Sequence, residues 1–244
     1  MGAALQEFGR GLVDAVFPPG CVHCGGLVEG GRLRHICEKC APLITRVAAP
    51  HCTTCGHPFY GVLEGERVCP HCQGLGPAFR EGRTAVLFKG PARALVIELK
   101  YHKGLHVLAD LGEIFRRVPW LLEHLRGATL VPVPLHPRKE RKRGYNQAAL
   151  LAEVLARAAG GATRVEPVLR RVSYAVSQTH FNRKARQENL KNAFALARGA
   201  VLNPEVRYLL VDDVFTTGST LNACARVLRR AGCLNLDVVT FGHG

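Results

Sequence analysis

Eight cysteines in the first 73 residues constrain this chain more than any other feature. They form four C-x-x-C pairs separated by gaps of 12, 11 and 13 residues: Cys21/Cys24, Cys37/Cys40, Cys52/Cys55 and Cys69/Cys72. A C-x-x-C turn directs two thiolates at one tetrahedral ion, so two consecutive pairs complete a four-cysteine zinc site. Gly25 and Gly56 directly follow second cysteines, where such a turn often needs a residue without a Cβ. The spacing therefore predicts two structural Zn²⁺ sites, one from the first two pairs and one from the last two.

Other uses of these cysteines fit the sequence less well. Disulfides or redox pairs are the alternative, since ten cysteines can also form a covalent framework. An iron–sulfur cluster is disfavoured because the sequence lacks the clustered C-x-x-C-x-x-C run. Nearby histidines could replace a thiolate but more often support the ligands or face solvent, so the ligand set leaves out His23, His35, His51, His57 and His71. Cys224 and Cys233 lie outside the pattern and are predicted to be buried as small apolar groups.

The cysteine pairs end before a second, longer part of the chain. We predict an N-terminal helix and double zinc ribbon over residues 1–78, and a larger domain over residues 79–244. The first part is too small and polar to bury much apolar surface, so bound metal is expected to supply its folding free energy. Apolar residues at helical spacing indicate a short amphipathic helix at its start: Leu5, Phe8, Leu12 and Val16.

No feature of the sequence indicates membrane insertion. It contains no apolar run of ~18 residues, and its first residues lack the basic stretch of a signal peptide. Gln6 also departs from the pattern for N-terminal myristoylation. We therefore expect a cytoplasmic protein.

From about residue 79, strand-like and helix-like segments alternate. Predicted strands cover residues 84–88, 129–135, 207–213 and 235–241. Predicted helices cover residues 91–102, 109–125, 147–159 and 221–232, with a break or kink expected at Pro119. This alternation is typical of an α/β fold with a parallel sheet.

The stretch LLVDDVFTTGST, residues 209–220, lies where a predicted strand passes into a helix. Ligands of parallel sheets bind beyond the carboxyl ends of the strands. Residues 216–220 can cradle a phosphate with N–H groups and hydroxyls at the positive end of the helix, and Gly218 allows close approach. Asp212 and Asp213 would repel an anion, but they can accept hydrogen bonds from the vicinal hydroxyls of a ribose. The stretch therefore predicts a ribose 5-phosphate site, and it matches neither the Walker A nor the dinucleotide-binding pattern.

This motif resembles the phosphoribosyl pyrophosphate motif of type I phosphoribosyltransferases. With the cysteine pairs and the stretch VPVPLHPRKERKRGYNQA, the chain from about residue 15 onward is similar to the ComF family of competence-associated proteins. That family carries a double zinc ribbon ahead of a phosphoribosyltransferase domain. The resemblance implies that Asp212 and Asp213 bind the ribose hydroxyls as the catalytic acidic pair, with Mg²⁺ accompanying the donor. It also implies that the 5-phosphate is bound by Thr216, Thr217, Gly218, Ser219 and Thr220.

The loop HPRKERKRGYN follows a predicted strand, where members of the family bind pyrophosphate. The resemblance points to Arg138, Lys142 and Arg143 as ligands, and Gly144 would permit the turn. Residues 136–198 contain 14 lysines and arginines against 4 glutamates, a net charge of +10. The whole chain is formally +14, and two zinc ions with eight thiolates would lower that by four. The positive field therefore belongs to the larger domain.

A second basic stretch, SYAVSQTHFNRKARQENLKNAF, covers residues 173–194. The transferases carry a flexible loop at this place that closes over the substrate, which implies that role for Arg183, Lys184 and Arg186. For either basic stretch, a solvated surface is the alternative interpretation.

Pyrophosphate alone does not need fourteen cations, so single-stranded DNA is predicted as a second ligand. Four aromatic residues in the basic stretches could stack on bases or belong to the core: Tyr145, Tyr174, His180 and Phe181. The stretch LKYHKG, residues 99–104, is a further basic turn found in family members, and its residues suggest no role.

Two classes of function follow. The first is a binding protein of natural transformation and DNA uptake, which holds phosphoribosyl pyrophosphate and single-stranded DNA beside a competence helicase. The alternative is an active phosphoribosyltransferase of nucleotide salvage or metabolism, in which Mg²⁺ and the basic loops stabilise departing pyrophosphate. We rank the competence role first, because no base-binding hood identifies an acceptor. The sequence leaves the acceptor, the oligomeric state and the protein partner open.

Overall fold

The protein is described from a computed structural model over residues 18–59, 68–161, 163–173 and 192–244. The expected N-terminal helix and the expected loop cations Arg183, Lys184 and Arg186 lie outside these residues. The described elements are η1 (Ala41–Leu43), β1 (Gly82–Leu87), α2 (Gly90–Tyr101), η2 (Leu105–Val107), α3 (Leu108–Arg116), α4 (Pro119–His124), β2 (Ala128–Pro132), α5 (Pro137–Arg143), α6 (Gln147–Ala158), β3 (Arg164–Val165), β4 (Leu169–Arg171), β5 (Phe194–Leu196), β6 (Arg207–Phe215), α8 (Ser219–Arg230) and β7 (Asn235–His243).

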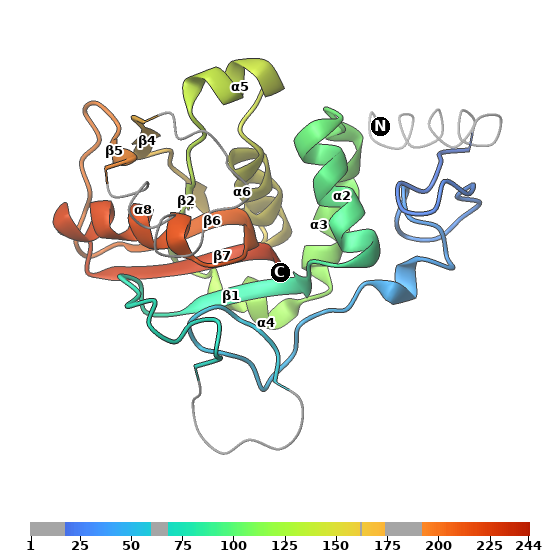
Figure 1. Cartoon of the computed structure of the whole chain (residues 1–244), viewed down its shortest axis with the longest axis horizontal. Coiled ribbons are helices and arrows are strands. Elements are labelled where there is room, and N and C mark those ends of the chain that lie inside the picture. Colours follow the sequence, from blue (N-terminus) through green and yellow to red (C-terminus); the bar gives the residue numbers. More distant parts are fainter. Residues whose placement is uncertain (1–17, 60–67, 162, 174–191) are drawn as a thin grey trace.

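Five strands form one parallel sheet. Its order is β1-β7-β6-β2-β3, so β7, which comes last in the sequence, lies between β1 and β6 (Figure 1). The register pairs Asp212 with Thr240 across β6 and β7, and Leu130 with Leu209 across β2 and β6. β4 and β5 form a separate antiparallel pair, and β5 contacts α8. The parallel sheet with its intervening helices confirms the predicted α/β class.

Strand β6 is buried on both faces. Leu209 and Val211 belong to the core that includes α2, α3 and α6, whereas Tyr208 and Leu210 belong to the core that includes α8. All four side chains are buried. A strand that is buried on both faces has apolar residues at successive positions, whereas a strand buried on one face has them at every second position. This burial explains the apolar residues that precede the two aspartates in the motif.

Pro119 breaks the helix predicted over residues 109–125. α3 ends at Arg116, and α4 begins at Pro119, which occupies the first turn of the new helix. Proline is tolerated there because the first N–H groups of a helix have no partner within it.

The loop predicted for HPRKERKRGYN is wrong over most of its length, because α5 occupies Pro137–Arg143. His136 caps this helix by accepting a hydrogen bond from Arg138 N. Gly144 ends it with a φ of 93°, which confirms the turn expected at that glycine. Five cations in a helix this short give the helix no apolar stripe, so the sequence pattern does not reveal it.

The zinc-binding part joins the sheet at its edge. Val47 N donates to Ala85 O, and Leu87 N donates to Thr45 O, both at 2.9 Å. Because β1 is the outermost strand on this side, residues 45–47 cover an edge that would otherwise be unpaired.

Candidate functional site

The eight paired cysteines gather into two groups of four. The ligand atoms lie within 4.8 Å of one another in each group, Cys21/Cys24/Cys37/Cys40 and Cys52/Cys55/Cys69/Cys72. Cys24 Sγ is 3.7 Å from Cys37 Sγ, and Cys55 Sγ is 3.6 Å from Cys69 Sγ. Tetrahedral zinc with Zn–S bonds of ~2.3 Å places its sulfurs ~3.8 Å apart. The geometry therefore fits two structural zinc ions, with the pairing that the spacing predicts.

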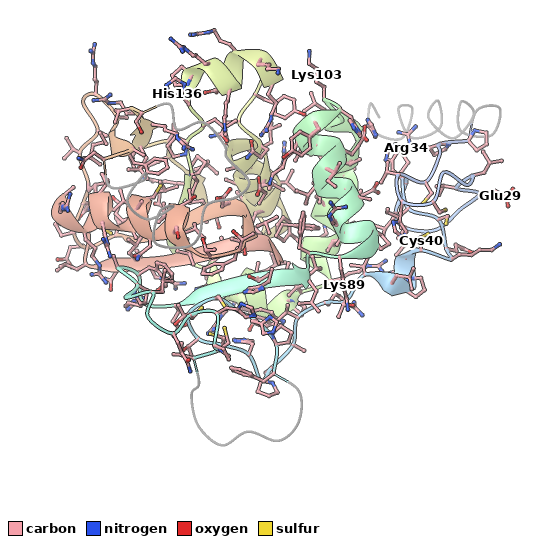
Figure 2. All side chains as sticks on the ribbon, viewed as in Figure 1. Glu29, Arg34, Cys40, Lys89, Lys103 and His136 are labelled. Atoms are coloured by element: carbon pink, nitrogen blue, oxygen red, sulfur yellow. The ribbon has the colours of Figure 1, made fainter. Side chains whose placement is uncertain are left out.

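The first ribbon is anchored by one buried carboxylate of α3. Asp110 is 1% exposed and accepts hydrogen bonds from Arg34 N at 2.6 Å and from His35 N at 2.9 Å. Its Oδ2 also lies 3.0 Å from His35 Nδ1. These contacts hold the ribbon against α3, and Figure 2 labels Glu29, Arg34 and Cys40 in this ribbon. The first zinc site therefore packs on the face of the sheet that α2 and α3 cover.

The second ribbon packs against α8 on the other face. Asn222 is 4% exposed, and its Nδ2 donates to Leu75 O and Gly76 O, both at 3.2 Å. Its Oδ1 accepts from Ala78 N at 2.8 Å. Arg229, two turns further along α8, donates from Nε to Ala78 O at 2.8 Å. The chain that leaves the second zinc site is therefore bonded along the helix that follows the predicted phosphate loop.

A small polar hollow lies at the start of α8. Its volume is about 40 Å³, and its lining is Asp212, Val214, Thr216, Thr217, Gly218, Ser219, Thr220 and Leu221. α8 begins at Ser219, so the N–H groups of its first turn and its positive dipole end face this region. Hydroxyls and helix N–H groups around one hollow form a suitable site for a phosphate group. The structure thus brings together the residues predicted to bind the 5-phosphate.

Gly218 forms the turn between β6 and α8. It is the N-cap of α8, with a left-handed backbone at φ 69°. Beside it, Thr217 Oγ1 donates to Ser219 Oγ at 3.0 Å and accepts from Ser219 N at 3.4 Å. A residue without a Cβ adopts this backbone without strain.

The two aspartates have different surroundings. Asp212 lines the hollow and is partly exposed, whereas Asp213 is 4% exposed. Asp212 Oδ1 accepts a hydrogen bond from Asp213 N at 2.8 Å. Burial raises the pKa of Asp212 to about 7, and the charge of Asp213 contributes in the same direction. Asp212 therefore carries only part of its negative charge near neutral pH, which weakens its repulsion of an anionic ligand.

Asp213 is held by residues from two helices. Its Oδ1 lies 2.7 Å from Lys100 Nζ of α2, and its Oδ2 accepts from Gln147 Nε2 of α6 at 2.8 Å. Arg143, the last residue of α5, donates to Gln147 Oε1. Sequence reasoning does not identify Lys100 or Gln147, although Lys100 lies in the stretch LKYHKG, whose first three residues belong to α2 instead of the predicted turn. These residues link α2, β6, α6 and α5 in one chain of polar contacts.

Cations lie close together on the α5 side of the aspartates. Burial lowers the pKa of Lys139, and the charges of Arg171 and Arg143 lower it further. Burial also lowers the pKa of Arg171, whose guanidinium carbon is 5.2 Å from the centroid of the Phe194 ring. Cations that disfavour one another's charge favour an anion between them. Lys139 and Arg171 are further candidate ligands for pyrophosphate that sequence reasoning does not assign to it.

The predicted pyrophosphate ligands all lie on α5, which projects from the sheet (Figure 1). Figure 2 shows His136 at the start of this helix. Arg138 and Lys142 are exposed, whereas Arg143 contacts the aspartate network through Gln147. The structure therefore connects one of the three predicted cations to the aspartates.

Tyr145 is half-buried and packs against the core, which does not favour a role in stacking on bases. Its hydroxyl donates to Leu99 O at 2.5 Å, and its ring packs against the core. The other aromatic residues proposed for base stacking lie outside the described residues: Tyr174, His180 and Phe181. The buried Cys224 and Cys233 confirm the apolar role predicted for them.

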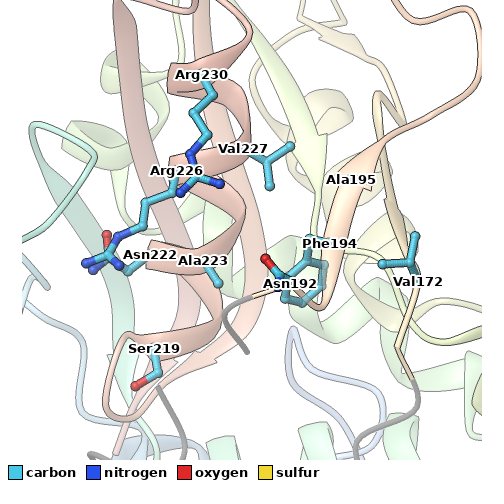
Figure 3. Close-up of a pocket in the computed structure, with 10 residues that line it drawn as sticks. All are labelled: Val172, Asn192, Phe194, Ala195, Ser219, Asn222, Ala223, Arg226, Val227 and Arg230. Atoms are coloured by element: carbon cyan, nitrogen blue, oxygen red, sulfur yellow. The ribbon is translucent and has the colours of Figure 1, made fainter. Parts of the chain in front are cut away.

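A larger cavity of about 320 Å³ lies between α8 and β5 and shares Ser219 with the polar hollow (Figure 3). Phe194 and Val227 contribute an apolar wall, and the exposed Arg226 and Arg230 lie on the α8 side. An apolar wall near arginines suits a ligand that combines a ring with negative charge, as a nucleotide does.

Comparisons with known proteins agree with this architecture. The family described as "Double zinc ribbon domain" matches residues 12–73. Competence protein F of Haemophilus influenzae is 30% identical over 222 residues, which cover 89% of this chain and 94% of that protein. The chain belongs to the competence protein F family. DNA utilization protein YhgH of Escherichia coli K12 is 31% identical over 214 residues, covering 83% of this chain and 88% of that protein. Membership confirms the resemblance expected from the sequence.

Two solved structures resemble part of the chain. Hypoxanthine phosphoribosyltransferase of Staphylococcus aureus matches 55% of this chain and 62% of its own, with 16% identity and a TM-score of 0.37. Purine phosphoribosyltransferase of Pyrococcus horikoshii matches 56% and 82%, with 12% identity and a TM-score of 0.35.

Helices that could cross a membrane are absent from the part of the chain that the structure describes.

Proposed function

We propose that this protein binds phosphoribosyl pyrophosphate at the start of α8. The observation that carries the proposal is the polar hollow of about 40 Å³, where Asp212 meets the hydroxyls and N–H groups of residues 216–220. The 5-phosphate binds at the N-terminus of α8, and the ribose hydroxyls bind at the acidic end of β6, where Asp212 lines the hollow. The partial charge of Asp212 near neutral pH supports binding of an anionic donor at this place.

The pyrophosphate group of the donor is proposed to bind beside α5, through Arg138, Lys142 and Arg143. This helix follows β2, which runs parallel to β6, so both strands end at the same edge of the sheet. Mg²⁺ would accompany the donor, because this ion is usually held by substrate phosphates with one or two carboxylates. The partly exposed Asp212 suits that ion better than the buried Asp213.

We further propose a role in natural transformation and DNA uptake through binding of single-stranded DNA. Relatives are named competence protein and DNA utilization protein, which supports a role with DNA. Five of the seven residues of α5 are lysine or arginine, and phosphate contacts supply most of the affinity for a nucleic acid backbone. A competence helicase is the protein partner that we expect.

Calorimetric titration with phosphoribosyl pyrophosphate and Mg²⁺ tests the donor site. The double change Asp212→Asn with Asp213→Asn should abolish binding, while the zinc content stays at two per chain. A control that neutralises the exposed Glu123 and Glu153 in the same way should bind like the parent. Equal affinity in the parent and the Asp212/Asp213 variant would show that the ribose assignment is wrong.

An active phosphoribosyltransferase of nucleotide salvage or metabolism is the alternative function. A screen for pyrophosphate release, with nucleobases, nucleotides and single-stranded DNA as acceptors, separates it from a binding role. Release with one acceptor would establish turnover. A protein that binds the donor and releases pyrophosphate with none of these acceptors belongs to the binding class.

A further inference from the structure

Asp212 and Asp213 are adjacent in sequence but face opposite sides of the sheet. Both belong to β6, and successive side chains of a strand point to opposite faces. Asp212 lines the hollow that precedes α8. Asp213 instead contacts Lys100 of α2 and Gln147 of α6, which cover the other face. A ribose in the hollow therefore meets the first aspartate.

Both carboxylate oxygens of Asp213 already have partners. Lys100 Nζ lies 2.7 Å from Oδ1, Gln147 Nε2 lies 2.8 Å from Oδ2, and the residue is 4% exposed. If a ribose hydroxyl displaced either partner, the half-buried cation of Lys100 or the buried amide of Gln147 would lose a bond to the carboxylate, which is costly. The Asp212 carboxylate has more freedom, because among the described residues its one hydrogen bond is the one that Oδ1 accepts from Asp213 N.

We propose that Lys100 is a positioning residue, which fixes Asp213 as a permanent counter-ion and leaves Asp212 as the acidic residue that contacts the ribose. The inference deepens the proposed function and rests on it. It assigns unequal roles to two residues that the family resemblance treats as a pair. It also gives the basic stretch LKYHKG a role, because that stretch supplies the lysine from the last turn of α2.

The same contacts extend from Lys100 to the basic helix. Gln147 presents its amide nitrogen to Asp213 and its amide oxygen to Arg143. Fixing Asp213 therefore also fixes the orientation of Gln147 and the end of α5. Lys100 offsets one of the two negative charges beside the hollow as well, which favours binding of an anionic donor.

Thermal unfolding of single and double variants tests the pairing without any ligand. Lys100→Met should lower Tm, because it leaves a buried carboxylate without its counter-ion. Adding Asp213→Asn should restore most of that loss, so the two changes together should cost less than their sum. Lys100→Arg, which keeps the charge, should stay closer to the parent than Lys100→Met. Additive losses in the double variant would overturn the pairing.

Titration with ribose 5-phosphate then tests the division of roles. Asp212→Asn should weaken binding at least about tenfold, whereas the Lys100→Met/Asp213→Asn variant should stay within about threefold of the parent. If that double variant unfolds like the parent but loses ribose 5-phosphate as fully as Asp212→Asn, Asp213 is a direct ligand and the proposal is wrong. If the parent binds neither ribose 5-phosphate nor phosphoribosyl pyrophosphate, the proposed function is wrong, and the unfolding experiment still decides the pairing.

Discussion

Gly218 packs so closely on Phe215 that a Cβ at position 218 would stand 2.5 Å from Cζ of that ring. Leu75 Cδ2, from the second ribbon, would lie 3.0 Å away. Gly218→Ala should therefore displace the loop and weaken binding of ribose 5-phosphate at least about tenfold. It should also destabilise the fold by about 1–3 kcal/mol through the strained left-handed backbone. Calorimetry and thermal unfolding measure the two effects.

Gly127→Ala is the matched control for this substitution. Gly127 has a φ of 71°, close to that of Gly218, but nothing lies within 4 Å of the position of its Cβ. It should therefore show a backbone cost without a change in ligand affinity. Equal affinity losses in the two variants would mean that the contact with Phe215 does not shape the binding site.

Asp212→Asn should stabilise the protein at high pH. An aspartate with a pKa of about 7 in the folded state and ~3.9 in the unfolded state holds its proton more tightly when folded. Its contribution to stability is therefore lost progressively as pH rises from about 4 to about 7. The variant removes this loss, so its gain in Tm should be small near pH 4, reach about half its full size near pH 5.5 and be largest near pH 8. The gain corresponds to at most about 4 kcal/mol.

Glu153→Gln, at an exposed position of α6, is the control for the pH series. It neutralises a carboxylate that water already surrounds, so its Tm should follow that of the parent across the pH range. A difference between Asp212→Asn and the parent that does not change between pH 5.5 and pH 8 would contradict a raised pKa at Asp212.

Loss of the second zinc site should impair ligand binding more than loss of the first. Cys69→Ser is expected to release the ion that supports Leu75 and the chain bonded to Asn222, beside the phosphate hollow. Affinity for ribose 5-phosphate should fall at least about tenfold. Cys24→Ser removes a ligand from the ribbon that docks on α2 and α3, and its effect should stay within about threefold. Zinc analysis should find about one ion per chain in each variant.

Equal effects on affinity from Cys69→Ser and Cys24→Ser, with equal zinc loss, would mean that the second ribbon does not support the binding site. A circular dichroism spectrum of each variant would show whether the α/β domain remains folded.

The basic helix should hold single-stranded DNA mainly through phosphates. Neutralising α5 by changing Arg138, Lys139, Arg141 and Lys142 to Ala should weaken binding at every salt concentration below about 0.2 M, with little dependence on base sequence. Each phosphate contact contributes about −0.7 to the slope of log affinity against log salt concentration, so the slope should flatten by up to about 3. Fluorescence anisotropy over a salt series measures both quantities.

A control variant removes the same number of exposed cations from other parts of the chain, by changing Lys89, Arg93, Arg116 and Arg126 to Ala. Its slope should stay closer to that of the parent. If the α5 variant binds DNA as tightly as the parent at all salt concentrations, the helix is a solvated surface or binds pyrophosphate alone.

The parts of the site that could be predicted from the sequence are those whose residues are close together in the chain. Each C-x-x-C pair places two ligands in one turn, and residues 216–220 surround one helix start. In both cases the local backbone decides where the side chains lie, so spacing alone carries the information. The strands were predictable for a similar reason, because burial on both faces leaves a continuous apolar run such as the one before Asp212.

The contacts between distant segments could not be predicted in this way. Lys100 and Asp213 are 113 positions apart, and their contact depends on how α2 packs over the end of β6. In the sequence, Asn222 is an ordinary polar residue of a helix. Its three hydrogen bonds to residues 75–78 form only when the second ribbon packs against α8. No local pattern encodes either arrangement.

The cover that residues 45–47 provide for β1 has a consequence for the newly made chain. β7 pairs with the other edge of β1, and it is synthesised about 150 residues later, roughly 8–30 s at ordinary ribosome rates. During that interval, segment 45–47 between the ribbons is the part of the chain available to shield β1 from neighbouring nascent polypeptides. When zinc is scarce, unfilled ribbons would leave both edges open to strand addition between chains. Zinc bound during translation should therefore lower the chance that β1 pairs with a strand of another chain before β7 is made.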